Sequence, residues 1–233
     1  MAGLMFPAHP APVLPIVGIS DGFPLFRIFC VGRNYAAHAA EMGGEVDREA
    51  PWYFTKSQAA YCPDNTTVLY PPGTANYHHE VELVVALGAD VFEASETEAR
   101  AAICGYAVGL DMTRRDRQQD GKDNRRPWSL GKDVESSAPI GPITMADTFG
   151  SLRDKTISLT VNGETRQSAL LTDMVWTPDQ VVSHLSQFYH LRAGDVIMTG
   201  TPAGVGPVVA GDKLVATIDG LAPLIHTIQG NAT

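Results

Sequence analysis

Two carboxylates one residue apart stand at the start of a strongly apolar run. Glu80 and Glu82 lie in "NYHHEVELVVALG", residues 76 to 88, and the apolar residues that follow predict a buried strand. Alternate strand residues share a face, so the two carboxylates should point the same way, about 6 to 7 Å apart. Like charges this close repel each other unless one takes up a proton or a cation lies between them.

A third carboxylate, Asp111, ends another predicted strand, "YAVGLD". With Glu80 and Glu82 it forms an all-oxygen set that suits a hard cation such as Mg²⁺, with Mn²⁺ or Ca²⁺ as alternatives. The competing interpretation is a row of exposed charges on an edge strand, the usual place for acidic residues. His78 and His79 could add a nitrogen ligand, but strand neighbours face opposite ways, so at most one of them can face the metal.

A histidine and a glutamate three residues apart suggest general-base chemistry. In "NYAAHAAEMGG" we expect a short helix capped by Asn34 and stopped by Gly43 and Gly44. His38 and Glu41 would then share one helix face, so Glu41 could orient His38 as a base. A solvated pair on an exposed helix is the alternative. Because so short a helix is not stable alone, it should either dock or move as a lid.

Other catalytic motifs fail on inspection. Lys132 follows Gly131, but Arg126 stands where a phosphate-binding loop needs its first glycine. The loop "GTPAGVG", residues 200 to 206, lacks the GxGxxG spacing, and no GxSxG elbow is present. The sequence therefore gives no support to a nucleotide-binding loop or a serine hydrolase.

Composition narrows the classes of partner. The chain has 233 residues, 44% of them hydrophobic, and a net charge of -9, which argues against a nucleic-acid surface and favours a small-molecule partner. Its three cysteines show no CxxC spacing, which fits a reducing cytoplasm. We find neither a signal-peptide pattern nor an apolar stretch of 18 residues, so we expect no membrane association and a cytoplasmic location.

Strands dominate the expected elements. "RIFCVG", residues 27 to 32, predicts a strand, and Ser95 with Glu98 predicts a capping box on a helix that ends near Gly105. Asn162 and Gly163 predict a type I′ hairpin. A helix from residue 177 to about residue 189 and further strands follow, so we expect an α+β fold. Residues 1–27 read as an arm or edge strand, and residues 28–233 as a single domain.

Six segments occur in an order that resembles the fumarylacetoacetate hydrolase family, and especially its short acylpyruvate hydrolases. They are "FCVGRNYAAHAAEMG", "YHHEVELVVALG", "GYAVGLDMTRRDRQ", "PWSLGKDVESSAPIGP", "VNGETRQ" and "GDVIMTGTPAGVGPV". The resemblance runs from about residue 28 to the end. It implies a β-rich α+β fold of packed, rolled mixed sheets with a short lid helix, a homodimer, and Mg²⁺ or Mn²⁺ held by Glu80, Glu82 and Asp111.

The same resemblance implies roles for further residues. His38 and Glu41 match the catalytic dyad of the family, and Lys132 matches its active-site lysine. The expected substrate contacts are Arg33, Arg115, Gln118 and Thr201. There are two departures from the family pattern: Ser57 follows Lys56 where many relatives have proline, and the segment after Asp111 is unusually basic because of Arg114 and Arg117.

The expected reaction is hydrolytic cleavage of the carbon-carbon bond of a 2,4-dioxo acid. Fumarylpyruvate, which would give fumarate and pyruvate in gentisate-type aromatic degradation, is the expected substrate, and its second carboxylate should meet Arg33 or Arg115. Arg114 and Arg117 are expected on a solvated face instead. The alternatives are oxaloacetate decarboxylation, isomerisation of unsaturated dioic acids, and a silent metal-binding module, which the presence of His38 argues against.

Overall fold

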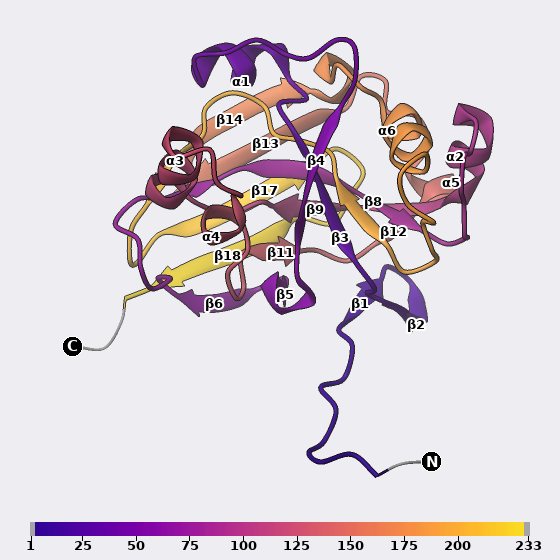
Figure 1. Cartoon of the computed structure of the whole chain (residues 1–233), viewed down its shortest axis with the longest axis horizontal. Coiled ribbons are helices and arrows are strands. Elements are labelled where there is room, and N and C mark those ends of the chain that lie inside the picture. Colours follow the sequence, from indigo (N-terminus) through magenta and orange to yellow (C-terminus); the bar gives the residue numbers. More distant parts are fainter. Residues whose placement is uncertain (1–2, 231–233) are drawn as a thin grey trace.

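A large mixed sheet forms the centre of the protein. The computed structural model describes residues 3–230. The sheet has eight strands, and β12 (Thr144–Met145) pairs with β9 beside the main path. The strands on the main path lie in the order β4 (Trp52–Lys56), β3 (Ile28–Gly32), β15 (Val196–Met198), β8 (Val81–Leu87), β9 (Ile103–Leu110), β11 (Ala138–Ile140) and β5 (Tyr61–Pro63) (Figure 1).

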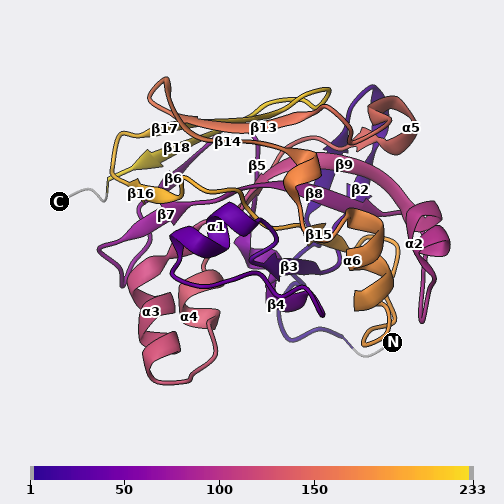
Figure 2. The same cartoon turned by 90° about the horizontal axis from the view of Figure 1, so that it is seen from above.

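A second sheet packs against one face of the first. Its strands lie in the order β14 (Glu164–Leu170), β13 (Thr156–Val161), β17 (Lys213–Ile218), β18 (Leu224–Gln229) and β6 (Thr66–Leu69). Figure 2 shows the two sheets as stacked layers. Leu83 and Leu110 of the first sheet and Leu159 and Leu214 of the second belong to one buried cluster between them. Burial of this apolar area provides much of the driving force that holds the layers together.

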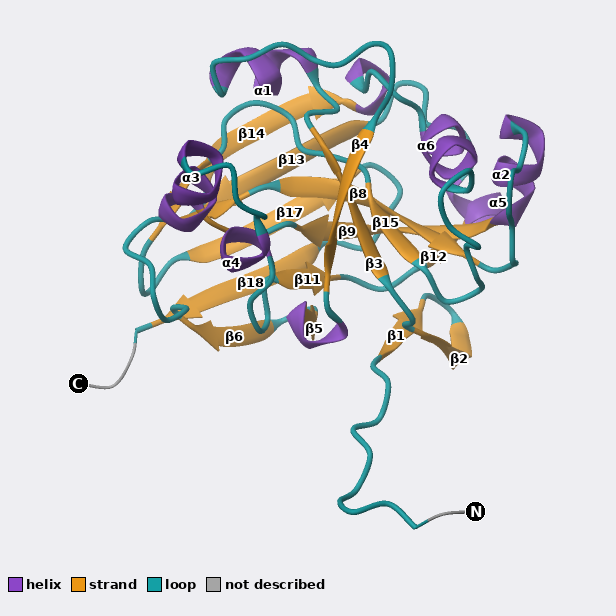
Figure 3. Ribbon diagram, viewed as in Figure 1, coloured by secondary structure: helices purple, strands orange, loops and turns teal. Residues whose placement is uncertain are grey.

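Two groups of helices lie at opposite ends of the large sheet (Figure 3). At one end α2 (Glu96–Ala102) and α6 (Pro178–Leu185) cover its other face, where Ala99 and Val182 pack on Phe29 and Leu87. At the other end lie α1 (Ala36–Glu41), α3 (Arg115–Asp123) and α4 (Ser129–Lys132). The remaining short helices are α5 (Ala146–Phe149) and the 3₁₀ turns η1 (Gln58–Ala60) and η2 (Leu171–Asp173).

A small sheet of three strands joins the two large sheets near α3. It consists of β10 (Thr113–Arg114), β7 (Tyr77–His79) and β16 (Gly206–Val208). β7 leads into β8, and β9 leads into β10, so the chain passes between sheets at Glu80 and again at Asp111. Glu80 and Asp111 thus lie side by side where the chain passes from the large sheet to the small one.

The predicted local elements are largely present. The fold is strand-rich α+β, as expected, and Asn162 and Gly163 both adopt positive φ, 52° and 85°, as a type I′ turn requires. The capping box of Ser95 is present. Two expected helix ends were wrong: α2 ends at Ala102, where β9 takes over, and α6 ends at Leu185 rather than near residue 189.

Residues 13–24 form a hairpin of β1 (Val13–Ile16) and β2 (Ile19–Pro24). Leu14 and Phe23 belong to the buried cluster beneath the large sheet. The backbone N–H of Val17 also donates to the carbonyl of Ile143 at 2.8 Å. The hairpin is therefore attached to the body of the fold. Within residues 3–230 no helix is long and apolar enough to cross a membrane.

Candidate active site

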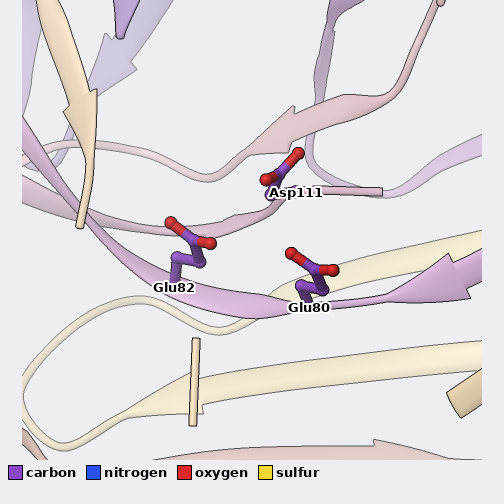
Figure 4. Close-up of side chains that lie close together, drawn as sticks. All are labelled: Glu80, Glu82 and Asp111. Carbon is purple, nitrogen blue, oxygen red and sulfur yellow. The ribbon is translucent and has the colours of Figure 1, made fainter. Parts of the chain in front are cut away.

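Three buried carboxylates converge where β8 and β9 leave the large sheet. Glu80 directly precedes β8, Glu82 lies within it, and Asp111 directly follows β9. The two strands are antiparallel partners, and the N–H of Asp111 donates to the carbonyl of Glu80 at 2.8 Å. Ligand oxygens of the three residues all lie within 4.8 Å of one another. Figure 4 shows Glu80 and Glu82 projecting from the same stretch of chain toward Asp111. The edge-strand alternative is therefore wrong.

Three cationic side chains surround these carboxylates. The Nζ of Lys132 lies 2.7 Å from Glu80 Oε2 and 2.6 Å from Asp111 Oδ2. Arg115 donates to Glu80 Oε1, and the Nζ of Lys56 lies 2.9 Å from Asp111 Oδ1. We call this set of six buried side chains the floor of the site: Glu80, Glu82, Asp111, Lys56, Lys132 and Arg115.

The positive charges compensate the carboxylates unevenly. Burial raises the pKa of Glu80, but Lys132 and Arg115 lower it further than burial raises it, so Glu80 is ionised. Glu82 has no cationic partner within residues 3–230, and the N–H of Gly200 donates to it at 2.7 Å. Burial, together with the neighbouring Asp111 and Glu80, raises the pKa of Glu82 well above its usual range. Negative charge is therefore undercompensated around Glu82.

The floor fits a divalent cation. Asp111 Oδ1 is buried and accepts no hydrogen bond from the described residues. Lys56 lies beside it, but its ammonium donates to the carbonyls of Met112 and Ser137, both at 3.1 Å, and to the hydroxyl of Ser137 at 2.9 Å. A buried oxygen without a donor and an undercompensated Glu82 are what a bound cation would satisfy. An all-oxygen donor set favours Mg²⁺ or Mn²⁺.

Neither histidine of the "YHHE" segment joins the carboxylates. His78 Nε2 pairs with Asn76 Oδ1 at 2.8 Å, and His79 Nδ1 pairs with Gln167 Oε1 at 3.1 Å. The metal-ligand cluster found among the described residues consists of Glu80, Glu82 and Asp111 alone. The expectation that one histidine could supply a nitrogen ligand is therefore wrong.

The predicted contact between the general base His38 and Glu41 forms on α1, and His38 lines the pocket. His38 Nδ1 lies 3.3 Å from Glu41 Oε2, and the carboxylate of Glu41 also accepts the N–H of Gly204 at 3.1 Å. His38 is buried, and burial lowers its pKa, although Glu80 and Glu41 oppose the shift. At neutral pH the imidazole is therefore uncharged and able to accept a proton.

Asn34 does not cap α1, contrary to the sequence-based expectation. Tyr35 occupies the cap position and makes no capping bond through its side chain. The amide of Asn34 instead donates to the carbonyls of Trp176 and Thr199, both at 2.8 Å, and accepts the N–H of Trp176 at 2.7 Å. These bonds fix the start of the base-bearing segment to two distant loops.

The residues expected to contact substrate gather in one pocket with His38 and with every floor residue except Lys56. Arg115 also donates to Gln118 Oε1 at 2.7 Å, and Thr201 accepts from Gln167 at 2.8 Å. The pocket is lined by Val31, Gly32, Arg33, His38, Met42, Trp52, Phe54, Glu80, Glu82, Asp111, Arg115, Gln118, Trp128, Lys132 and Thr201.

Sequence reasoning missed several of these residues. It did not identify the aromatic wall of Trp52, Phe54 and Trp128, and it noted Lys56 only for the residue that follows it. A lysine at the end of the largely apolar strand "WYFTK" was the one signal for a buried ion pair.

Arg114 and Arg117, which were expected on a solvated face, are not among the residues that line the pocket. Arg114 donates to the carbonyl of Pro72 and Arg117 to the carbonyl of Gly73, both in an exposed loop.

Comparison with known proteins identifies relatives along nearly the whole chain. The profile described as fumarylacetoacetate (FAA) hydrolase C-terminal matches residues 27–229. A fumarylpyruvate hydrolase of a Ralstonia species is 44% identical over 189 residues, 80% of this chain and 98% of the relative. An oxaloacetate tautomerase of Escherichia coli is 42% identical over 199 residues, 85% of this chain and 90% of the relative.

A solved structure agrees closely with the fold. The crystal structure of fumarylpyruvate hydrolase from Pseudomonas aeruginosa in complex with Mn²⁺ and pyruvate superimposes with a TM-score of 0.94 at 43% sequence identity. The match covers 98% of this chain and 100% of that one.

Proposed function

The chain belongs to the fumarylacetoacetate hydrolase family, and on that premise we propose that it hydrolyses the carbon-carbon bond of an acylpyruvate, with fumarylpyruvate as the substrate. The observation that carries this proposal is the buried carboxylate cluster with a buried, uncharged histidine in the same pocket. The relative crystallised with Mn²⁺ and pyruvate supports it, since pyruvate is one product of the reaction.

Glu80, Glu82 and Asp111 hold the metal in this account. Bound there, Mg²⁺ or Mn²⁺ supplies Lewis-acid polarisation of the 2-oxo acid and charge stabilisation. The uneven neutralisation of the three floor carboxylates fits a metal bound among them. Glu80 is already neutralised by Lys132 and Arg115, whereas Glu82 and Asp111 Oδ1 retain capacity for a further positive charge.

His38 acts as the general base. Its uncharged imidazole takes a proton from water, and the water oxygen adds to the acyl carbonyl of the 2,4-dioxo acid. Glu41 accepts from Nδ1, which fixes the tautomer and leaves Nε2 to receive the proton. General-base assistance of this kind typically contributes roughly 10² to 10⁴ in rate.

Collapse of the tetrahedral adduct breaks the carbon-carbon bond. The acyl group leaves as a carboxylic acid, and pyruvate leaves as its enolate, which then takes up the proton held by His38. Burial opposes charge on Lys132, but Asp111 and Glu80 raise its pKa above the ordinary value, so it stays an ammonium. Its positive charge lies in the pocket where negative charge develops on the enolate.

Exchange between the keto and enol forms of oxaloacetate is the second candidate, because a relative with that activity is 42% identical. Such a reaction needs a base and charge stabilisation but no attacking water. The Ralstonia fumarylpyruvate hydrolase and the Pseudomonas structure favour the hydrolase. Oxaloacetate decarboxylation and isomerisation of unsaturated dioic acids remain alternatives from the sequence.

A product assay tests the proposal. Purified protein with Mn²⁺ should convert fumarylpyruvate to equal amounts of fumarate and pyruvate, with a higher kcat/KM than for tautomerisation or decarboxylation of oxaloacetate. A kcat/KM for either oxaloacetate reaction that exceeds the value for every acylpyruvate would overturn the assignment.

We also propose that the protein works as a cytoplasmic homodimer in gentisate-type degradation of aromatic compounds. Resemblance to the short acylpyruvate hydrolases supports the dimer and the pathway. The chain has an odd number of cysteines, three, without CxxC spacing, which supports a reducing compartment. Light scattering coupled to size-exclusion chromatography tests the dimer, and a monomeric mass at micromolar concentration would contradict it.

A further inference from the structure

Arg33 is a pocket arginine without a hydrogen-bond or ion-pair partner in the part of the chain that the structure describes. It lines the same pocket as the floor and is half-buried. Among residues 3–230 it makes no hydrogen bond or ion pair, whereas Arg115 is engaged with Glu80 and Gln118. The two arginines that the sequence could not separate are thus distinguished by the structure. Arg115 belongs to the floor, and Arg33 has donors left for a ligand.

The position of Arg33 is built into the backbone. Arg33 has a φ of 55°, a left-handed conformation that is uncommon for a residue with a side chain. Its guanidinium passes over Gly44, where an added Cβ would lie 2.8 Å from Nη1. The missing side chain at Gly44 leaves the guanidinium room between the pocket and the loop that follows α1.

Arg33 is not one of the cations that pair with the floor carboxylates. Lys56, Lys132 and Arg115 make the ion pairs with Glu80 and Asp111, and Arg33 makes none with the floor among residues 3–230. Lys122 of α3 is a second such cation, since it is half-buried and has no carboxylate partner within residues 3–230. Burial lowers the pKa of Lys122, and the nearby charges of Arg115 and Arg33 lower it further. A partly buried zone at this side of the pocket therefore favours an anion.

An aromatic wall continues from the floor toward this zone. Trp52 and Trp128 meet edge to face with ring centroids 4.9 Å apart, and Lys122 Nζ lies 5.3 Å from the centroid of Trp128. The indole of Trp52 lies against the backbone of Gly32, where an added Cβ would lie 2.1 Å from a ring carbon. The two indoles line the pocket at nearly a right angle to each other, so a conjugated acyl chain can lie against the face of one and the edge of the other.

Building on the proposed function, we infer that Arg33, assisted at longer range by Lys122, binds the terminal carboxylate of a fumaryl group whose planar chain lies along Trp52 and Trp128. The substrate class is then an acylpyruvate with an unsaturated, carboxylate-ended acyl chain. Arg33 is the specificity-determining residue, because guanidinium matches carboxylate in a two-point hydrogen bond that a methyl group cannot accept.

A matched substrate pair tests this assignment. Fumarylpyruvate and crotonylpyruvate differ in that a methyl group replaces the terminal carboxylate. The ratio of their kcat/KM values should fall about 10- to 150-fold in Arg33→Gln, mainly through KM for fumarylpyruvate. Arg33→Lys should recover part of the ratio, and Lys122→Gln should lower it by about threefold, because Lys122 acts without direct contact.

Arg117→Gln is the matched control, since Arg117 is exposed and donates to the carbonyl of Gly73 outside the pocket. An unchanged ratio in Arg33→Gln, or an equal fall in Arg117→Gln, would overturn the inference. If the wild-type enzyme hydrolysed neither substrate, the proposed function would be refuted instead. Fumarate and crotonate titrated calorimetrically into the Mn²⁺-loaded enzyme test Arg33 without turnover, and equal binding of fumarate by wild type and Arg33→Gln would also overturn it.

Discussion

The floor of the site and the segment that carries the base are built in opposite ways. The floor carboxylates lie on or beside the central strands β8 and β9, and each is no more than 4% exposed. The base lies on α1, a helix of six residues, and the side chain of its partner Glu41 is 35% exposed. We call residues 35–44 the cover.

The contrast separates binding from proton transfer. The floor is set by sheet register and by buried ion pairs, so it is in place before substrate arrives. The cover is too short to be stable alone and depends on the bonds of Asn34 and on the contact of Glu41 with Gly204. We expect substrate to enter by displacement of the cover, and water to be activated when the cover returns.

The largest effect should come from the floor carboxylate without a cationic partner. Glu82→Gln should lower kcat/KM with Mn²⁺ on the order of 10³-fold, because metal-derived charge stabilisation is worth several kcal/mol. The pKa of Glu82 is raised in the folded state, so ionisation of Glu82 makes the folded protein less stable as pH rises. Glu82→Gln removes this ionisation and should therefore raise the urea midpoint of the metal-free protein at neutral pH.

Steady-state kinetics with Mn²⁺, with the chelated enzyme as the zero point, measure kcat/KM. Urea unfolding of the metal-free protein measures the midpoint. Glu164→Gln, on the exposed strand β14, is the control and should change neither quantity. A lower urea midpoint for metal-free Glu82→Gln would contradict undercompensated charge at that position.

Lys56→Met should be the most destabilising of these changes. Its ammonium is fully buried against Asp111, and removal of one partner leaves an uncompensated charge that costs about 3–5 kcal/mol. Urea unfolding of the metal-free protein measures the loss. Lys213→Met, at an exposed lysine, should cost less than about 0.5 kcal/mol. If the two losses were equal, the buried pair would not be a structural element of the floor.

Glu41→Gln should affect rate and spare stability, which is the reverse of Lys56→Met. The glutamine oxygen can still accept from Gly204, but it provides no negative charge to His38. We expect kcat to fall about tenfold, with less than about 0.5 kcal/mol change in unfolding free energy. Single-turnover kinetics and urea unfolding provide the two values, and a large stability loss would show that the cover is structural.

The pH profile should shift in the same variant. Burial lowers the pKa of His38 from its ordinary value, so kcat/KM should be flat at neutral pH and fall as acid protonates the base. Glu41 raises this pKa, so Glu41→Gln should move the acid limb to still lower pH. A limb that moves to higher pH would contradict the assigned role of Glu41.

Local signals in the sequence were sufficient for much of the fold and the site. Spacing placed Glu80 with Glu82 and His38 with Glu41, because strand and helix periodicities alone decide which residues share a face. Asn162-Gly163 determined a turn through backbone conformation. These features depend on residues a few positions apart.

The remaining features depend on contacts across the chain. Asn34 is separated by 142 residues from Trp176, and Lys56 by 81 residues from Ser137, so no local pattern encodes either interaction. The early end of α2 has a similar cause: residues from Ile103 onward pair with β8, and this tertiary pairing outweighs helix propensity.

Replacement of His38 tests the division between floor and cover most directly. In His38→Gln the floor is untouched, so calorimetry should find Mn²⁺ affinity within about threefold of wild type, while kcat for fumarylpyruvate should fall roughly 10²- to 10⁴-fold. Normal turnover by the variant, or loss of Mn²⁺ binding together with turnover, would contradict the account.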